Sequence, residues 1–463
     1  MSSAEEPTAV ERSRDLERSR DHVICVDFGS TFTKASLVDL AGGRVVAAAE
    51  HRTTIDTDVL DGYDACLAEL VRQDARAASA PTLACSSAGG GLRIAVVGNE
   101  ELVTAEAGRR VALSSGGKVV AVFAAGREDD LNELPGCRPD VVLLTGGTDG
   151  GNQEPILACA RAIAPVWPGP VVVAGNVDAQ AAVTQILAHH PLVVAPNIVP
   201  RIGALAPEGA RTAIRELFLS HVIGGKHLST RDDFLAMVQG ATPDVVLTGV
   251  ELLADVAGDT VVVDVGGATT DVHSVVEIDP EDAGLSREVV ATTRVTRTVE
   301  GDLGMRWSAV TTVEAGGRDD LAAAAVRRRD DVGFVPDGAD DEEAAYDEEI
   351  AREAVALALR RHAGRSKVVV SPEGRVVERT GKDLREVDLL VGSGGVLRHG
   401  RPGVAGRVFA GSVGEVDGGW QLPRRAHVVV DTDYVLAAAG LLAPAHRDAA
   451  TLLVSRLATA PTA

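Results

Sequence analysis

A short acidic and hydroxyl-rich turn near the N-terminus has the residue types of a nucleotide phosphate site. An apolar run ends in Asp27, and Gly29, Ser30, Thr31 and Thr33 follow before a second apolar run. A turn between two strands can direct backbone N–H groups and hydroxyls at phosphate oxygens, while a carboxylate holds the accompanying Mg²⁺ through water. Apolar strands ending in D-x-G also form ordinary hairpins, so this stretch alone leaves both interpretations open.

The stretch VVVDVGGATTDVH repeats this arrangement later in the chain. Asp264 ends an apolar run, Gly266 and Gly267 follow, and Thr269 and Thr270 supply hydroxyls before a returning strand. Two such hairpins could clamp one triphosphate from both sides, with the aspartate of each hairpin sharing the metal ion. The repetition therefore favours the phosphate-site interpretation.

A third glycine-rich turn could receive the nucleoside. The run VDLLVGSGGVLRH is a buried strand that delivers Gly392, Ser393, Gly394 and Gly395 into a turn. Because glycine has no side chain, a nucleoside ring can approach the backbone closely at such a turn.

Two further motifs lack a required residue. The stretch SHVIGGKH resembles the end of a P-loop, but Ser220 stands at the first glycine and His227 replaces the Ser/Thr. Asp271 and His273 form the start of the D-x-H-x-x-G loop that ligates cobalamin, but Val276 stands at the glycine. We therefore predict neither a Walker A site nor direct cobalamin ligation.

The composition limits the class of protein. With 463 residues and 45% apolar content, the chain can bury a large core, and two to four domains are expected. No stretch approaches the roughly 18 uncharged apolar residues of a membrane span, and the N-terminus has no apolar segment for a signal peptide. We therefore expect a cytoplasmic protein. A formal charge of -22 argues against nucleic acid as a general partner, because phosphate neutralisation needs clustered Lys and Arg.

The cysteine and aromatic residues exclude other kinds of site. Cys25, Cys66, Cys85, Cys137 and Cys159 are scattered without a C-x-x-C pair, so neither a zinc knuckle nor an iron–sulfur bridge is predicted. Buried free thiols in a reducing compartment are expected instead. An aromatic content of 3% is too low for a base-stacking platform.

The elements that must position these turns alternate along the chain. Short Val-rich runs alternate with helical patterns from about residue 118 to 200, which predicts a parallel sheet covered on both faces. The turn TGGTDGGN (145–152) ends one of these strands, where open α/β sheets bind ligands, and both a structural turn and an anion or partner site stay open. The predicted segments are a flexible leader (1–20), a first lobe (21–258) with the inserted α/β segment, a second lobe (259–445) with a charged subdomain (about 315–365), and a C-terminal tail (446–463).

The charged subdomain contains opposite charges in blocks. Arg327–Arg329 precede the acidic run DGADDEEAAYDEE at 337–349, which leads into a helix. These blocks predict an exposed region, either a solvated face or a partner-docking surface.

These pieces, in this order, resemble the actin-like ATPase superfamily, which includes sugar kinases, heat-shock chaperones and actin. DFGSTFTK (27–34) is similar to its first phosphate motif, DVGGATTD (264–271) to its second, and GSGG (392–395) to its adenosine motif. GVELLADVAG (249–258) and YVLAAAGLL (434–442) are similar to its two connecting helices. The resemblance implies an α/β fold of two related RNase H-like lobes around a cleft, with nucleotide binding coupled to lobe closure.

Within that superfamily the chain closely resembles the GlmL/MutL family, which is encoded beside adenosylcobalamin-dependent glutamate (methylaspartate) mutase and is distinct from the mismatch-repair protein of the same name. The resemblance is carried by DFGSTFTKASLVDL, DVVLLTGGTDGGN, VVVAGN, PNIVPRIGAL, VDVGGATTDVHSV and RTVEGDLGMR. It implies an accessory protein that binds the mutase subunits and reactivates them with ATP by expelling damaged cobalamin.

The resemblance also implies roles for individual residues. Asp27 and Asp264 would position Mg²⁺ and the attacking water, and the hydroxyls and amides of the two hairpins would bind the phosphates of ATP. Lys34 would add positive charge toward the transferred phosphoryl group, or form a salt bridge on its strand. Glu251, at the start of the first connecting helix, would orient the water. Because phosphoryl transfer depends mainly on positioning and charge stabilisation, a slow Mg-dependent ATPase is expected.

Other activities fit the same cleft. A small-molecule kinase would add a substrate hydroxyl and a base, although no sugar-specific or acid-specific signature is present. A non-hydrolysing scaffold would use nucleotide only to control docking. An activator with a bridging iron–sulfur cluster is disfavoured, because it needs a close cysteine pair.

Overall fold

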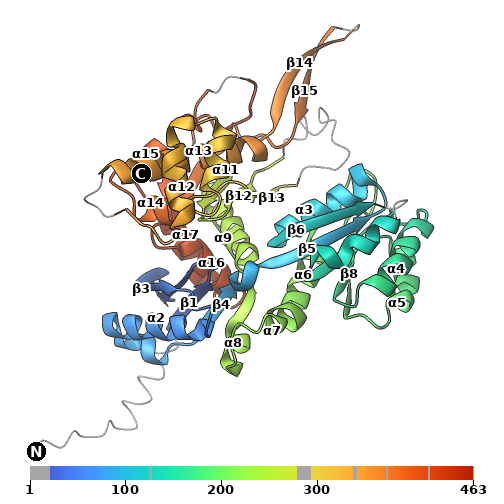
Figure 1. The fold of residues 1–463 in the computed structure, drawn as a ribbon, viewed down its shortest axis with the longest axis horizontal. Coiled ribbons are helices and arrows are strands. Elements are labelled where there is room, and N and C mark those ends of the chain that lie inside the picture. Colours follow the sequence, from blue (N-terminus) through green and yellow to red (C-terminus); the bar gives the residue numbers. More distant parts are fainter. Residues whose placement is uncertain are drawn as a thin grey trace, which may run out of the picture. The chain divides into compact units, whose positions relative to one another are not determined.

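The computed structural model describes residues 21–124, 128–278, 293–336, 341–371, 374–415 and 418–461. The chain divides into two compact units, each assembled from separate segments (Figure 1). The first comprises Met1–Leu92, Phe218–Leu252 and Val435–Arg456. The second comprises Arg93–Leu217, Leu253–Tyr434 and Leu457–Ala463.

The first unit contains a five-stranded sheet in the order β10-β4-β1-β2-β3. Its strands are β1 (His22–Phe28), β2 (Phe32–Asp39), β3 (Arg44–Arg52), β4 (Thr82–Ser86) and β10 (Val238–Ala241). The first three form an antiparallel meander, whereas β4 runs parallel to β1 and β10 runs parallel to β4. Every residue of β1 is buried, as its apolar sequence predicts for a central strand.

Helices pack on both faces of β1. Phe28 contacts Tyr63 of α2 (Val59–Gln73) and Phe234 of α8 (Asp232–Met237), with ring centroids 6.3 and 5.3 Å apart. On the opposite face, the Cys25 thiol lies 3.8 Å from the carbonyl oxygen of Ala438 in α16 (Val435–Leu442). Because side chains alternate along a strand, Asp27 shares the face of Cys25.

Two helices with small residues approach each other closely. A Cβ on Gly249 of α9 (Thr242–Ala257) would lie 2.1 Å from the carbonyl oxygen of Leu436. A Cβ on Gly440 of α16 would lie 1.9 Å from the carbonyl oxygen of Val245. Only glycine fits at either position, so the backbones of α9 and α16 are in direct contact.

The second unit contains a sheet of the same topology, in the order β13-β12-β11-β16-β17. Its strands are β11 (Thr260–Val265), β12 (Thr270–Val275), β13 (Val295–Glu300), β16 (Leu389–Ser393) and β17 (His427–Val430). Here too β11, β12 and β13 form an antiparallel meander, whereas β16 runs parallel to β11 and β17 runs parallel to β16. The shared strand order confirms the predicted α/β fold with duplicated RNase H-like domains of the actin-like type.

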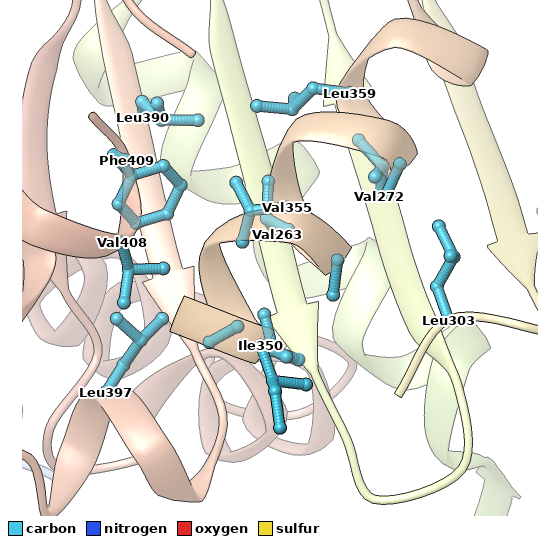
Figure 2. Close-up of a cluster of buried hydrophobic side chains, with 14 of the residues drawn as sticks. Val263, Val272, Leu303, Ile350, Val355, Leu359, Leu390, Leu397, Val408 and Phe409 are labelled. Carbon is cyan, nitrogen blue, oxygen red and sulfur yellow. The ribbon is translucent and has the colours of Figure 1, made fainter. Parts of the chain in front are cut away.

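The helix α13 (Asp341–His362) packs against this second sheet, and the two together form the main hydrophobic core there. Val263 and Val272 of the sheet pack against Ile350, Val355 and Leu359 of the helix, and all five are fully buried (Figure 2). Smaller helices complete the layer: α11 (Ala309–Gly316), α12 (Ala322–Asp330), α14 (Gly395–Arg398) and α15 (Val404–Val408). This apolar face fixes the position of the loops at the carboxyl ends of β11 and β16.

A third sheet, in the order β6-β5-β7-β8-β9, also belongs to the second unit. Its strands are β5 (Leu92–Gly98), β6 (Gly117–Ala124), β7 (Val141–Leu144), β8 (Val171–Val173) and β9 (Leu192–Val194). Its helices include α3 (Glu106–Ser114), α4 (Glu154–Val166), α5 (Gln180–Ile186) and α6 (Glu208–Leu217). Strands β5, β7, β8 and β9 are parallel, and β7 and β8 are buried throughout, as predicted. The sheet begins upstream of residue 118.

The charged blocks are exposed only in part, whereas the sequence predicts an exposed region: Arg327 and Arg329 are exposed, but several of their charged neighbours are buried in ion pairs. The Arg328 side chain is fully buried, and its Nε donates to Oδ1 of Asp347 at 2.6 Å. Glu348 is 6% exposed and pairs with Arg401 and Arg407, which holds the pKa of its carboxyl at about 2 despite burial. The opposite charges of separate elements neutralise each other, which a single block of the sequence does not reveal. The first residues of the acidic run, 337–340, lie outside the described residues.

Three remaining elements complete the described chain. A two-stranded ribbon is formed by β14 (Arg365–Ser371) and β15 (Gly374–Thr380), and the last helix is α17 (Arg447–Ala458). Among the described residues, no helix combines the length and apolar character needed to cross a bilayer. The predicted leader, 1–20, lies outside the described residues.

Candidate nucleotide site

The first predicted turn connects β1 to β2 and exposes its hydroxyls. The Gly29 N–H donates to the carbonyl oxygen of Phe32 at 3.1 Å, and Ser30 and Thr31 between them are exposed. A Cβ on Gly29 would lie 2.6 Å from that carbonyl oxygen, so the tight turn requires glycine. Thr53 braces the turn by donating from Oγ1 to the Gly29 carbonyl oxygen at 2.7 Å. The arrangement leaves two hydroxyls at the tip of a rigid turn.

The other two polar residues of this hairpin lie on β2. Thr33 is fully buried and its Oγ1 shares a 3.2 Å hydrogen bond with Oγ1 of Thr53, so its hydroxyl helps to hold the turn. Lys34 is half-buried and stands directly opposite Asp27 in the β1–β2 register. Directly opposed side chains lie on the same face of a sheet, so Lys34 and Asp27 share one face.

Asp27 lies at the end of β1 and is 4% exposed. Its Oδ1 accepts a 2.5 Å hydrogen bond from Oγ1 of Thr242, the first residue of α9, and lies 3.6 Å from Sγ of Cys85. Burial, reinforced by the negative charge of Asp27, raises the pKa of the Cys85 thiol well above its usual value. Cys85 is therefore a neutral thiol, and the carboxylate of Asp27 is held between two uncharged groups.

The start of α9 supplies residues that the sequence interpretation missed. That interpretation began the helix at Gly249 and put Glu251 at its start, which is wrong: α9 begins at Thr242, so Glu251 lies in its second half. The polar residues in its first turn are Thr242 and the buried Asp244. The run Thr-Pro-Asp was the available signal, because Pro and an acidic residue favour the first turn of a helix.

The second predicted turn connects β11 to β12 and is braced by a separate segment. The Gly266 N–H donates to the Thr269 carbonyl oxygen at 2.9 Å. The N–H groups of Met305 and Arg306 donate to the carbonyl oxygens of Gly266 and Gly267 at 3.0 and 2.8 Å. These bonds hold the carbonyl side of the turn.

The polar side chains of the second hairpin differ in exposure. Thr270 is fully buried and donates to the Leu303 carbonyl oxygen at 3.1 Å, so it anchors the strand. Thr269 is half-buried and donates to Oδ2 of Asp271 at 3.2 Å. Asp264 is half-buried and stands opposite Asp271 in the register of β11 and β12. Asp264, Thr269 and Asp271 are therefore the partly accessible polar residues of this hairpin, and Asp271 is paired with Arg297.

The third predicted turn lies beside the second. Strand β16 runs parallel to β11, with Ser393 paired to Asp264. Gly394 has a φ of 110°, and a Cβ there would lie 2.2 Å from the carbonyl oxygen of Val265. No heavy atom lies within 4 Å of the position that a Cβ on Gly395 would take. Gly392 completes the set at the end of β16, where a Cβ would meet the side chains of Leu397 and Phe409.

The structure thus brings the predicted residues together in two groups. Asp264, its glycine turn and the 392–395 turn form one group at the carboxyl ends of β11 and β16 in the second unit. Asp27 and the 29–31 turn form the other group in the first unit. Carboxyl ends of strands are the usual ligand side of an α/β sheet.

Each group, taken by itself, has residue types that suit a magnesium–nucleotide complex. Mg²⁺ prefers to keep several waters and to bind through one or two carboxylates plus phosphate oxygens, and each group offers one aspartate beside a turn. Within the described residues, no cluster of three or more His, Cys, Asp or Glu side chains could hold a metal ion by itself.

The TGGTDGGN turn at 145–152 is a firmly bonded loop. Nδ2 of Asn197 donates to the Gly147 carbonyl oxygen at 2.9 Å and to Oδ1 of Asp149 at 2.8 Å. Nδ2 of Asn176 donates to the Gly151 carbonyl oxygen at 3.2 Å. The loops after β7, β8 and β9 are therefore tied together at one edge of the third sheet.

Comparison with known proteins identifies relatives along nearly the whole chain. The family described as MutL protein matches residues 23–457. "Protein MutL" of Clostridium tetanomorphum is 34% identical over 460 residues, which cover 94% of this chain and 99% of that protein.

Solved structures show more distant similarity. Xylulose kinase from Bifidobacterium adolescentis is 12% identical, with 96% of this chain and 94% of that chain covered and a TM-score of 0.29. The ethanolamine utilization protein EutJ from Carboxydothermus hydrogenoformans is 10% identical, with 94% and 89% covered and a TM-score of 0.29. At these scores the likeness carries no argument, and the fold assignment rests on the strand order of this chain.

Proposed function

The chain belongs to the MutL family, and we propose that it is a cytoplasmic accessory protein that binds Mg·ATP and hydrolyses it slowly to reactivate an adenosylcobalamin-dependent mutase of the glutamate (methylaspartate) type. The observation that carries the nucleotide part is the duplication. Two sheets of the same strand order each end their first strand in an aspartate, Asp27 or Asp264, followed by a glycine-containing turn.

The two turns have different tasks in this proposal. Ser30 and Thr31 bind phosphate oxygens with their exposed hydroxyls, together with the backbone N–H groups of their turn. Thr269 and the amide of Gly267 do the same in the second hairpin, whereas the Gly266 N–H donates to the Thr269 carbonyl oxygen and closes the turn. Thr33 and Thr270 keep the two hairpins in shape from inside, because both hydroxyls are buried and hydrogen-bonded.

The charged residues complete the proposed site. Bound Mg²⁺ would neutralise the phosphate charge, and Asp264 would hold it through its waters, while Asp27 offers the equivalent carboxylate in the first unit. Lys34 adds positive charge on the face of Asp27. The buried Thr242–Asp27 hydrogen bond fixes the direction of that carboxylate before nucleotide binds. Preorganised charges of this kind stabilise a phosphoryl-transfer transition state without further rearrangement.

The nucleoside part of the proposal concerns the 392–395 turn. The parallel pairing of Asp264 with Ser393 puts this turn next to the second phosphate turn. The open space over Gly395 admits a ring against the backbone. One nucleotide can therefore reach from the 392–395 turn to Asp264 within the second unit.

Phosphate release in the presence and absence of the mutase tests the reactivation step. We expect slow release from ATP by the purified chain, and faster release when mutase subunits that carry inactive cobalamin are added. Asp264→Asn should abolish both rates and the rescue of the mutase, whereas Asp56→Asn, in an exposed loop before α2, should leave them unchanged. Stimulation by a small metabolite and not by mutase would instead indicate a kinase. Tight ATP binding without release over hours would indicate a scaffold.

A further inference from the structure

A buried arginine joins the second phosphate hairpin to the third sheet. Arg297 of β13 is 5% exposed, and its Nε and Nη2 donate to Oδ1 of Asp271 at 3.0 and 2.6 Å. Its Nη1 donates to the carbonyl oxygens of Leu113 and Gly117 at 3.0 and 3.3 Å. Leu113 is near the C-terminal end of α3 and Gly117 begins β6, so one guanidinium connects the two sheets of the second unit.

On the hairpin side, Arg297 controls the charge next to the phosphate turn. Asp271 stands directly opposite Asp264, and opposed like charges destabilise a sheet. The guanidinium neutralises Asp271, which also accepts the hydroxyl proton of Thr269. Thr269 has a single hydroxyl proton. If the Thr269 hydroxyl donates to a phosphate oxygen, its hydrogen bond to Asp271 is lost. Asp271 is then paired with Arg297 alone.

On the other side, α3 carries the connection to the 145–152 loop. A cation at the C-terminus of a helix is stabilised by the unpaired carbonyl groups, and Arg297 occupies this position on α3. Just before the start of α3, the carbonyl oxygen of Thr104 accepts a 3.0 Å hydrogen bond from Oγ1 of Thr145. Thr145 is fully buried and is the first residue of the loop. Hydrogen bonds therefore hold this helical segment at both ends, to the hairpin and to the loop.

We infer that Arg297 is a positioning residue that transmits occupancy of the 266–270 turn to the 145–152 loop. The inference rests on the proposed nucleotide function. When the Thr269 hydroxyl donates its hydrogen bond to a phosphate oxygen in place of Asp271, the pairing of Asp271 with Arg297 changes. The guanidinium then moves and shifts the end of α3. Because Asn176 and Asn197 tie the loop to its neighbours, this edge of the third sheet responds as one body. The third sheet is thus the element that reports the nucleotide state to a partner.

Amide hydrogen exchange of the full chain, with and without saturating Mg·ATP, tests this coupling. In the wild-type chain we expect slower exchange in the 266–269 turn, which reports binding, and a change of at least about fivefold in the 145–152 loop. Arg297→Lys keeps the charge but loses the planar guanidinium that reaches Asp271 and two carbonyl oxygens at once, so the loop response should disappear while the turn stays protected. Arg294→Lys, at a half-buried arginine nearby that pairs with Glu277, should retain both responses.

A second variant acts at the far end of the connection. Thr145→Val keeps the shape of the side chain and removes its bonds to the carbonyl oxygens of Thr104 and Val97, so the turn should be protected by ATP and the loop should no longer respond. A protected turn with an unresponsive loop in the wild-type chain would overturn the coupling. So would a full loop response in both folded variants. If ATP protects no part of the wild-type turn, the proposed nucleotide function itself fails.

Discussion

The hydroxyl of Thr242 donates a 2.5 Å hydrogen bond to the buried carboxylate of Asp27. Replacement of Thr242 by Val should therefore leave a buried carboxylate without its strongest neutral donor. We expect the free energy of unfolding to fall by about 1–3 kcal/mol in denaturant titrations. Phosphate release should fall as well, because Asp27 would lose its fixed direction.

Thr248→Val provides the matched control for this change. Thr248 lies on the same helix and donates only to the carbonyl oxygen of Asp244, one turn earlier. Its loss should change the free energy of unfolding by a few tenths of a kcal/mol, because such back-bonding contributes little to a helix. Equal effects of the two substitutions would mean that the bond to Asp27 has no special importance.

Gly249→Ala should disrupt the contact between α9 and α16. The added methyl group would lie 2.1 Å from the Leu436 carbonyl oxygen, so one helix must move. We expect a loss of about 1–3 kcal/mol in unfolding free energy, measured by thermal or denaturant unfolding. Gly225→Ala has open space around its Cβ and should be neutral or slightly stabilising. A fully stable Gly249→Ala variant would rule out the close helix contact.

Asp347→Asn should be among the most damaging changes of a charged residue. Asp347 is 6% exposed and accepts from both Arg306 and Arg328, so the substitution leaves the fully buried Arg328 and the largely buried Arg306 with reduced compensation. Breaking a buried pair on one side costs about 3–5 kcal/mol. Asp319→Asn, at an exposed position before α12, should cost less than about 0.5 kcal/mol. A comparison of the two midpoints in urea decides whether Asp347 of the acidic block is internal, as described, or solvated.

Lys382 predicts a specific pH dependence of stability. It is buried, and desolvation lowers the pKa of its ammonium group to about 7 in the folded chain. Because the unfolded chain binds this proton more tightly, the contribution of Lys382 to stability is greatest above about pH 10. It decreases as the pH falls toward 7, by up to about 1.4 kcal/mol per pH unit, and is constant below that.

Comparison with Lys382→Met isolates this contribution. Unfolding free energies of both chains should be measured from pH 7 to pH 10. The difference between them should change with pH in the direction given above. A difference that is independent of pH would show that the folded chain keeps the lysine proton at its ordinary affinity.

Local patterns were sufficient for the elements that carry the predicted site. The two hairpins, the 392–395 turn and the Val-rich strands of the third sheet were predictable, because each depends on residues close in the sequence. The close contact of α9 and α16 followed from their small residues. Family resemblance added the order of the motifs, and the strand order of the two sheets confirmed the fold it implies.

Long-range partners were not predictable in the same way. Thr242 bonds to a residue 215 positions earlier, and no local pattern assigns that pair. The charged blocks were predicted to be exposed because the sequence does not reveal that Arg328 and Asp347 neutralise each other across two helices. The role of Arg297 likewise depends on carbonyl oxygens of α3 and β6, which any sequence could supply.

Binding of Mg·ATP to the purified full chain, measured by titration calorimetry, tests the central claim most directly. We expect wild-type chain and Asp56→Asn to bind, and Asp27→Asn and Asp264→Asn each to bind at least about tenfold more weakly, which corresponds to about 1.4 kcal/mol. The absence of binding by the wild-type chain, or wild-type affinity in both aspartate variants, would contradict the account.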